Sequence, residues 1–362
     1  MATQISIYTQ TEYYADLIQQ VDQVGDGGRI ALASMSFNHL DPSVATLLPK
    51  LACAARRGVN VLLVVDTATF IFDSTYKPTG PAAPFPIGGN RKTKAVFGER
   101  IAALNELRQA GVSVTQTNEP KQIHIPFADR SHIKAAVIND MWRVGGCNLD
   151  DTSNLDVMAG ANNDPKTATY IYNILQQIAA AGSVRAALGD SDLVHPIDDS
   201  TELLIDVGRP GQSVIYERAL DTIRNAKDWV TMTCQFFPSG KTAALLAGAT
   251  KRGVTVKALY NGPTDKRLGG GVMDIYRRYE RLIRPAALFE GEIDPSLPFL
   301  HAKIVASESE ANIGSHNNIS AGVILGTAEI ALHSTNPALA RAAGDMALQL
   351  SGSRRDTILT DV

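Results

Sequence analysis

The sequence predicts an α/β protein built from two repeated α/β units, each with a mixed β-sheet flanked by helices and related by a pseudo-two-fold axis. Amphipathic helices alternate with short apolar strands, and the second half of the chain repeats the order of the first. The length of 362 residues corresponds to two domains or one large domain at about 150 residues each. With 44% apolar and 20% charged residues, the composition is typical of folded proteins and excludes collagen-like, disordered or disulfide-dense chains.

The elements of the two halves follow one another in the same order. In the first half the pattern predicts a helix at 13–27, a strand at 29–37, a helix ending at 57, a strand at 61–65 and a helix at 98–110. In the second half it predicts a helix at 214–226, a strand at 229–237, a helix ending at 252, a strand at 256–260 and a helix at 272–284. Gly58 and Gly253 follow basic residues at the ends of matching helices, where a left-handed C-cap is expected.

The spacing of matching landmarks locates an insertion and a boundary. Arg57 and Arg252 are 195 residues apart, whereas His132 and His301 are 169 apart, so the first half carries 26 extra residues. They correspond to the Pro- and Gly-rich stretch 71–96, which we interpret either as a lid or substrate-facing loop or as a plain surface insertion. A Gly-, Asp- and Pro-rich linker at 189–212 separates the halves, and we expect repeats at 1–195 and 196–362.

Each half reaches a short predicted strand that begins with His-x-Lys. His132 and Lys134 form the first pair, and His301 and Lys303 form the second. In an extended chain, residues i and i+2 point to the same face, so each pair projects together. A polar turn then returns the chain, and a Gly-(Gly/Ser)-x-Asn segment begins 13 residues after each histidine. One His-x-Lys pair carries little weight, but two copies in a duplicated frame indicate a site at the interface of the repeats.

This pattern resembles the HKD motif of the phospholipase D superfamily, in which His-x-Lys is followed by four residues, Asp, and then Gly-Ser-x-Asn. The resemblance covers nearly the whole chain as two repeats. Three details depart from it: each hairpin is one residue shorter, Asn139 and Glu308 stand at the Asp position, and Gly146 replaces the serine of the first copy. In the family this Asp mainly structures the hairpin, so its replacement leaves the reactive groups in place.

The resemblance implies a phospho-histidine intermediate. One histidine attacks phosphorus, and the other protonates the leaving alkoxide and then activates the acceptor. We assign His132 as the nucleophile and His301 as the acid/base, with the reverse assignment open. The chemistry is consistent with this, because phosphodiester cleavage without a metal needs a nucleophile, an acid and cations around the phosphoryl oxygens.

The remaining candidate residues bind phosphate or orient the histidines. Lys134, Lys303, Asn148, Asn317 and Ser315 are expected to bind the phosphoryl oxygens. The family often has an Asn-x-acid triplet shortly after the Gly-Ser-x-Asn segment. Asp156 ends such a triplet and Glu329 ends an approximate one, so each either orients a histidine or is a solvated strand residue.

Composition and motifs predict few further ligands. No sequence has the spacing of a metal site, and the three cysteines suggest neither a disulfide framework nor zinc, so we expect no metal ion and no other cofactor. The sequence begins without a signal peptide and contains no membrane-spanning stretch. We therefore expect a cytoplasmic protein that contacts membranes peripherally.

The substrate is predicted from weaker signals. The segment Gln235-Phe-Phe-Pro238 and the Gly-Gly-x-Asn-Leu-Asp150 run resemble the cardiolipin-synthase-like branch of phosphatidyltransferases. A net charge of −3 and 6% aromatic residues disfavour nucleic acid as a partner. We favour a phospholipid substrate with water or an alcohol as acceptor. A metal-independent nuclease is the alternative, and a catalytically inactive binding module is disfavoured because both His/Lys pairs are intact.

Overall fold

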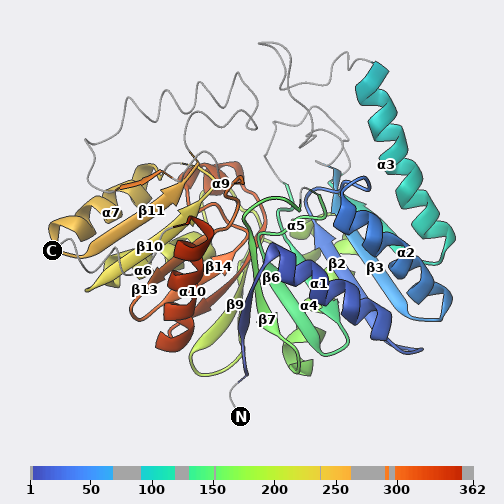
Figure 1. Cartoon of the computed structure of the whole chain (residues 1–362), viewed down its shortest axis with the longest axis horizontal. Coiled ribbons are helices and arrows are strands. Elements are labelled where there is room, and N and C mark those ends of the chain that lie inside the picture. Colours follow the sequence, from blue (N-terminus) through green and yellow to red (C-terminus); the bar gives the residue numbers. More distant parts are fainter. Residues whose placement is uncertain are drawn as a thin grey trace.

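The computed structural model describes residues 3–67, 91–118, 130–150, 152–236, 238–261, 290–292 and 298–352. Two β-sheets lie next to each other, and helices flank both (Figure 1). The predicted fold class, two repeated α/β units with mixed sheets, is confirmed. The predicted helix at 272–284 and the part of the 71–96 insertion up to residue 90 lie outside the described residues.

The first sheet has seven strands in the order β1-β7-β6-β5-β2-β3-β4. Its strands are β1 (Ser6–Thr9), β2 (Arg29–Ser34), β3 (Asn60–Asp66), β4 (Ser113–Thr117), β5 (Ala135–Ile138), β6 (Met141–Gly145) and β7 (Val157–Ala161). Strands β2, β3 and β4 are parallel, and the other neighbours are antiparallel. The sheet is therefore mixed, as alternating helices followed by a hairpin predict.

The second sheet has eight strands in the order β12-β11-β10-β13-β14-β15-β9-β8. Its strands are β8 (Leu193–Pro196), β9 (Thr201–Asp206), β10 (Trp229–Cys234), β11 (Thr255–Tyr260), β12 (Glu290–Glu292), β13 (Ile304–Ser307), β14 (Ala311–Gly314) and β15 (Glu329–Ser334). Apart from β8, this order repeats that of the first sheet strand for strand. Strand β8 runs across the boundary expected between residues 195 and 196 and pairs with β9.

Helices cover both sheets, and several of them begin with the same sequence signal. They are α1 (Gln10–Gln23), α2 (Pro42–Arg56), α3 (Arg91–Gln109), α4 (Pro165–Ala181), α5 (Val184–Leu188), α6 (Val214–Asn225), α7 (Gly240–Lys251), α9 (Ser320–Leu325) and α10 (Pro337–Leu350). Asp41, Asp164 and Asn336 each cap a helix whose first residue is proline, and each side chain accepts a backbone N–H of the first turn. Gly58 and Gly253 have the positive φ expected after α2 and α7.

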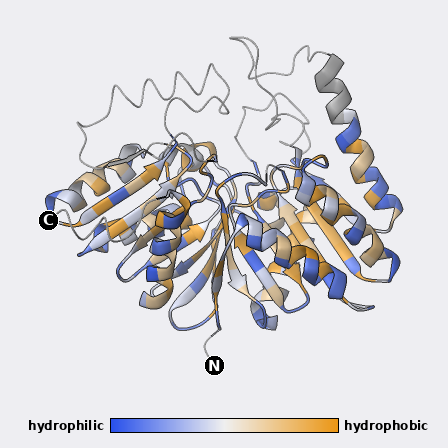
Figure 2. Cartoon of the chain, in the orientation of Figure 1, coloured by the Kyte–Doolittle hydropathy of each residue, from blue (hydrophilic) through white to orange (hydrophobic). Residues whose placement is uncertain are grey.

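One apolar core joins the two halves. It contains inward residues of both sheets, such as Trp142 and Ile330, together with residues of α4 and α10 such as Ile171 and Ala343. Separate clusters lie under α1 and α2 in the first half and under α6 and α7 in the second. Figure 2 shows the apolar residues concentrated along the strands and the polar ones along helices such as α3. The shared core holds the two sheets in a defined relation, which positions the residues at their edges.

The sequence predicts that each strand begins with its histidine, and this is wrong. The strands begin directly after the lysines, β5 at Ala135 and β13 at Ile304. Before those residues the backbone pairs with the other half of the molecule. Isolated parallel bridges join Ser131 to Ala328 and Leu155 to Leu300. Each histidine is thus placed at the contact between the halves by hydrogen bonds that a sequence pattern does not specify.

Candidate active site

Backbone hydrogen bonds between the halves place both histidines. The His132 N–H donates to the carbonyl of Ala328 at 2.8 Å, and the His301 N–H donates to the carbonyl of Leu155 at 2.8 Å. Ala328 and Leu155 directly precede Glu329 and Asp156. Each histidine is therefore held beside an acid that comes from the opposite repeat.

The side chains form two crossed pairs. His132 Nδ1 lies 2.7 Å from Oε2 of Glu329, and His301 Nδ1 lies 2.6 Å from Oδ2 of Asp156. The side chains of Asp156 and Glu329 are only 1% and 3% exposed. Both acids thus contact a histidine rather than solvent, and each pair leaves Nε2 of its imidazole as the atom available for chemistry.

Two buried lysines complete the centre of the site. Lys134 and Lys303 are fully buried, and each ammonium group donates one hydrogen bond to the backbone carbonyl of the histidine two residues before it. A lysine has three N–H donors, so this contact leaves others for an anion. Burial is the main cause that lowers the pKa of Lys134 to about 7; the charge of Lys303 adds to the shift, and the carboxylates of Glu329 and Asp156 oppose it. Burial also lowers the pKa of Lys303.

Burial and the two lysines keep both imidazoles neutral in the free protein. Burial is the main cause of a lowered pKa in His132, and the charges of Lys134, Lys303 and His301 add to it. The pKa of His301 falls to about 4, mainly through burial and Lys303, although Asp156 opposes the shift. The same positive charges act on both histidines, so the structure brings His132, His301 and both lysines into one site.

The two acids differ in their electrostatic state. Burial raises the pKa of Glu329 above its usual value. Burial also acts upward on the pKa of Asp156, but the charges of His301 and Lys303 outweigh it and hold that pKa below its usual value. Asp156 also accepts the backbone N–H of Val157 at 2.9 Å, whereas Glu329 accepts the hydroxyl of Ser315. The crossed pairs are therefore similar in geometry and unequal in charge.

We expect the lowered pKa of His301 to make folding stability sensitive to acid. The unfolded histidine has a pKa near 6.5 and the folded one about 4, so between these values the unfolded chain binds more protons. Stability is thus fully present above the unfolded pKa and is lost as the pH falls toward 4, by up to about 3 kcal/mol. Urea unfolding near pH 7 and near pH 5 should show a smaller acid loss in His301→Gln than in the parent. The raised pKa of Glu329 acts in the opposite direction in both proteins, and equal losses would contradict the expectation.

The motif asparagines and Ser315 follow strands β6 and β14. Asn148 is buried, and the hydroxyl of Ser34 donates to its Oδ1 at 3.4 Å. Asn317 is half-buried, and its Oδ1 is a buried atom without a hydrogen-bond partner among the described residues. The hydroxyl of Ser315 donates to Glu329 and accepts the N–H of Ile330 at 3.0 Å, so its contacts here orient the acid.

The substitution of Gly146 for the motif serine has a steric reason. A Cβ atom at this position would lie 2.0 Å from Oδ1 of Asp156, far inside contact distance. The second repeat has the longer Glu329 and a serine, whereas the first has the shorter Asp156 and a glycine. The first repeat thus positions its acid through the backbone N–H of Val157 and needs no hydroxyl at 146.

Asn139 and Glu308 keep the hairpin contact expected of the motif aspartate. Asn139 has a left-handed φ of 50°, and its Oδ1 accepts the N–H of Arg29 at 3.0 Å. The carboxylate of Glu308 accepts the N–H groups of Lys227, Asp228 and Trp229, the residues that lead into β10. Both side chains tie the hairpin to the first strand of its own parallel set, so the departures from the motif change the residue type and preserve the role.

Two polar residues that the sequence analysis missed also reach the histidine segments. Asp66 ends β3 and accepts the N–H of Ser131, and Asn261 follows β11 and accepts the N–H of Leu300. They are 195 residues apart, the same offset as Arg57 and Arg252. A polar residue at the matching end of two buried strands was therefore the signal that could have revealed them.

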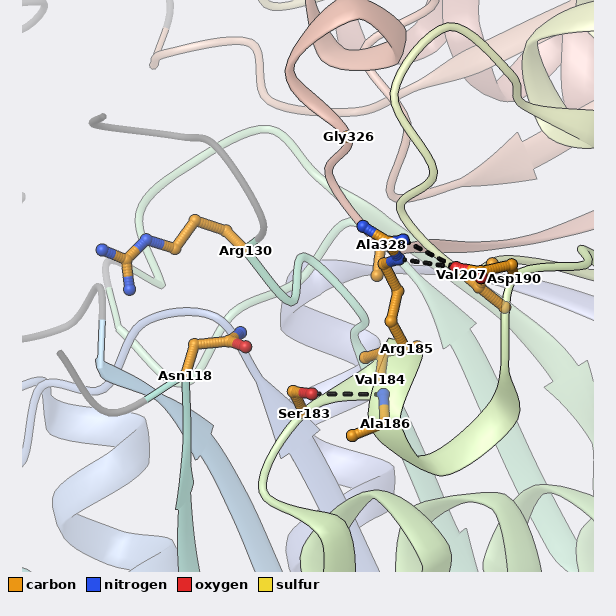
Figure 3. A pocket seen from close by; sticks show the side chains of 10 residues that line it. All are labelled: Asn118, Arg130, Ser183, Val184, Arg185, Ala186, Asp190, Val207, Gly326 and Ala328. Carbon is orange, nitrogen blue, oxygen red and sulfur yellow. Dashed lines mark hydrogen bonds and ion pairs between the residues drawn. The ribbon is translucent and has the colours of Figure 1, made fainter. Parts of the chain in front are cut away.

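A polar cavity of about 380 Å³ adjoins the His132 segment (Figure 3). It is lined by residues of both halves, including Asn118, Arg130, Ala328 and Arg185. The Arg185 guanidinium pairs with Asp190 at 2.6 Å, and in Figure 3 the Arg130 side chain extends away from it. Within the described ranges, no group of three or more His, Cys, Asp or Glu residues has metal-binding geometry. No helix in the described part of the chain is long and apolar enough to span a membrane.

Strand order and the paired His-x-Lys segments together define a two-repeat protein with a phospholipase D-like fold, and similar solved structures agree. Phosphatidylserine synthase from Haemophilus influenzae has a TM-score of 0.66 at 11% identity, over 96% of this chain and 88% of that one. Polyphosphate kinase from Porphyromonas gingivalis has a TM-score of 0.52 at 13% identity, over 93% of this chain. The present chain spans 49%, or about half, of that kinase.

A smaller protein matches half of the chain. Nuc, a phospholipase D family member from Salmonella typhimurium, matches 50% of this chain and 95% of its own length at 18% identity, with a TM-score of 0.32. Comparison of the sequence alone matches no protein-family model and no curated protein. The predicted resemblance to the phospholipase D superfamily is confirmed at the level of the fold.

Proposed function

We propose that this protein is a phosphodiesterase or phosphatidyltransferase of phospholipase D type, which acts on phospholipids through a phospho-histidine intermediate. The observation that carries the proposal is the pair of crossed His–carboxylate contacts around two buried lysines. Two imidazoles with oriented Nδ1 atoms and two ammonium groups supply what a phosphodiester needs for cleavage: a nucleophile, an acid and cations.

In the first step, Nε2 of His132 attacks phosphorus while its Nδ1–H donates to Glu329. The bond between phosphorus and the leaving oxygen breaks, and His301 gives its Nε2 proton to that oxygen. In the second step, His301 takes the proton of water or an alcohol, whose oxygen attacks phosphorus and breaks the N–P bond. The free His132 returns, so atoms and protons balance over the cycle.

The free site favours an anion. Two buried lysines make a phosphoryl group the natural occupant, since its oxygens accept the remaining Lys N–H donors. A bound phosphodiester anion raises the pKa of Lys134 and of both histidines, because it stabilises their charged forms. Substrate binding thus supplies the protonated His301 that the first step requires, although the free imidazole is neutral.

Lipid is favoured over nucleic acid by overall charge and by structural similarity. A protein with a net charge of −3 lacks the excess of basic residues on which nucleic-acid affinity largely depends. The similarity to a phosphatidylserine synthase extends over 96% of the chain. A metal-independent nuclease is the alternative function.

A direct comparison of substrates tests this proposal. We expect the purified protein, assayed in excess EDTA, to release headgroup or exchange alcohol in phosphatidylglycerol vesicles and to leave single- and double-stranded DNA intact. Lys92 and Lys94 are basic residues of the 71–96 insertion, one interpretation of which is a substrate-facing loop. Reversing their charges should weaken activity on anionic vesicles by more than tenfold, because each basic residue contributes about 1 kcal/mol to binding an anionic membrane, and it should have little effect on soluble bis(4-nitrophenyl) phosphate. Robust DNA cleavage without lipid turnover would establish the nuclease instead, and complete loss of activity in EDTA would contradict the metal-independent mechanism.

A further inference from the structure

Asp66 and Asn261 occupy equivalent places in the two repeats. Asp66 is the last residue of β3, and Asn261 directly follows β11, the matching strand of the second sheet. Both side chains are buried, with residue exposures of 1% and 6%. Neither belongs to the motif segments. Each accepts a hydrogen bond from the backbone N–H of the residue that precedes the histidine of its repeat.

The contacts of Asn261 hold both backbone polar groups of one residue, Leu300. Its Oδ1 accepts the Leu300 N–H at 2.9 Å, and its Nδ2 donates to the Leu300 carbonyl at 2.8 Å and to the Gln235 carbonyl at 3.0 Å. Leu300 also forms the bridge to Leu155 of the other half. The amide of Asn261 therefore holds the backbone from which the His301 side chain projects.

Asp66 holds the backbone before His132 through a carboxylate group. Its Oδ2 accepts the Ser131 N–H at 2.8 Å and the Asn118 amide at 2.6 Å, and its Oδ1 lies 3.4 Å from Nη1 of Arg130. The second repeat has Phe299 where the first has Arg130, and there the acceptor is the neutral Asn261. Asp66 is thus paired with Arg130 in the first repeat, and Asn261 is accompanied by Phe299 in the second. The hydrogen bond to the backbone N–H before the histidine is present in both repeats.

Within the part of the chain that the structure describes, the His132 segment borders a cavity. Arg130 and Ala328, which bond to each other through Ala328 N–H and the Arg130 carbonyl, both line the 380 Å³ cavity shown in Figure 3. Side chains that pack against a backbone restrict its movement, and a cavity supplies no such contacts. The hydrogen bonds from Ser131 and Arg130 to Asp66 restrain the segment beside that cavity.

From this geometry we propose that Asp66 and Asn261 are paired positioning residues, each of which sets the orientation of the histidine in its own repeat relative to the acid of the other repeat. The inference rests on the proposed phosphodiester chemistry for its kinetic test. The two residues should affect different chemical steps, which a general loss of stability would not do. Loss of Asn261 should slow proton transfer by His301, and loss of Asp66 should slow the attack of His132.

The kinetic test uses two leaving groups. With a phospholipid, whose alkoxide leaving group needs a proton, Asn261→Ala should lower kcat about 100-fold with KM nearly unchanged, because small misplacements of a catalytic group have effects of this size. With bis(4-nitrophenyl) phosphate, whose leaving group needs little protonation, the loss should be less than about tenfold. Asp66→Ala and the milder Asp66→Asn should slow both substrates alike. Asn261→Asp, which keeps the acceptor for Leu300 N–H, should recover part of the lost rate.

A spectroscopic readout does not depend on turnover. The Nδ1 proton of each histidine, hydrogen-bonded to a carboxylate, should give a downfield proton resonance, and Asn261→Ala should shift only that of His301 while Asp66→Asn shifts only that of His132. Asn312→Ala and Asp164→Asn are matched controls, since both residues are buried. The side chain of Asn312 bonds to Thr222 and His333, and that of Asp164 accepts the indole N–H of Trp142, so neither supports the segments of His132 and His301. Thermal unfolding confirms that each variant is folded.

The outcomes separate the two proposals. If Asn261→Ala keeps the parent kcat on the phospholipid and leaves the His301 resonance in place, the positioning role is wrong. It is also wrong if both variants shift both resonances and slow both substrates equally, because that is a structural effect. If the parent protein cleaves neither diester while the resonances shift as stated, the positioning role holds and the proposed reaction fails.

Discussion

Replacement of His132 or His301 by alanine is expected to reduce turnover at least 1,000-fold, on the order of what loss of a nucleophile or a general acid costs. The two variants should differ in what accumulates. His301→Ala retains the nucleophile, so bis(4-nitrophenyl) phosphate should convert it to a covalent phospho-enzyme on His132. His132→Ala should form none. Intact-protein mass spectrometry under alkaline quench, in which phosphohistidine survives, measures this directly.

The control and the contrary outcomes are specific. His333 is also a buried histidine of the second sheet, but its Nδ1 lies 3.1 Å from Oδ1 of Asn312 instead of a carboxylate, so His333→Ala should keep substantial activity. Accumulation in His132→Ala and not in His301→Ala would reverse the two roles. Activity within tenfold of the parent in both active-site variants would remove the site from the proposal altogether.

Neutralising the two acids is expected to give the second-largest effect, with kcat lowered by about 100- to 10,000-fold in Asp156→Asn and Glu329→Gln. An amide in place of the carboxylate cannot accept the Nδ1–H and stabilise an imidazolium equally well. The crossed contacts determine which step each acid serves. Asp156 is in the first repeat but bonds to His301 of the second, so Asp156→Asn should impair the acid step.

Leaving-group dependence measures this crossing. Asp156→Asn should lose much more activity on a phospholipid than on bis(4-nitrophenyl) phosphate, and Glu329→Gln should lose about equally on both. Asp164→Asn is the matched control, because Asp164 is a buried acid that accepts the indole N–H of Trp142 at 3.0 Å outside the site. The opposite dependence, together with phospho-enzyme on His301, would mean that the histidine roles are exchanged and the crossing is intact. Equal loss in both acid variants on both substrates would contradict the crossing.

Much of the fold could be predicted from local sequence signals. Apolar periodicity located β2, β3, β10 and β11, and basic residues followed by glycine located the ends of α2 and α7. These elements follow from period and capping, which are local properties of a chain. The repeated order of helices, strands and His-x-Lys motifs predicted the duplication that the two sheet orders confirm. The additional edge strand β8 has no counterpart among the described strands of the first repeat, so a comparison of the two repeats could not predict it.

For the candidate site, too, local sequence signals predicted some features and not others. The sequence by itself determined that His132, Lys134, His301 and Lys303 recur in matching segments, because the His-x-Lys spacing and the following glycine and asparagine are local and repeated. It also marked Asp156 and Glu329 as candidate acids. It could not pair each acid with a histidine, since each pair joins residues of different repeats, 145 and 197 positions apart.

Only the tertiary structure decided that pairing, through the shared apolar core and the bridges Ser131–Ala328 and Leu155–Leu300. Tertiary structure likewise decided why Gly146 replaces serine, because the obstructing carboxylate of Asp156 lies on a neighbouring strand segment. Asp66 and Asn261 became visible for the same reason: a buried side chain at a strand end acquires its role from the backbone that folds against it. Local periodicity specifies the elements, and the burial of their apolar faces against one another determines which polar groups meet.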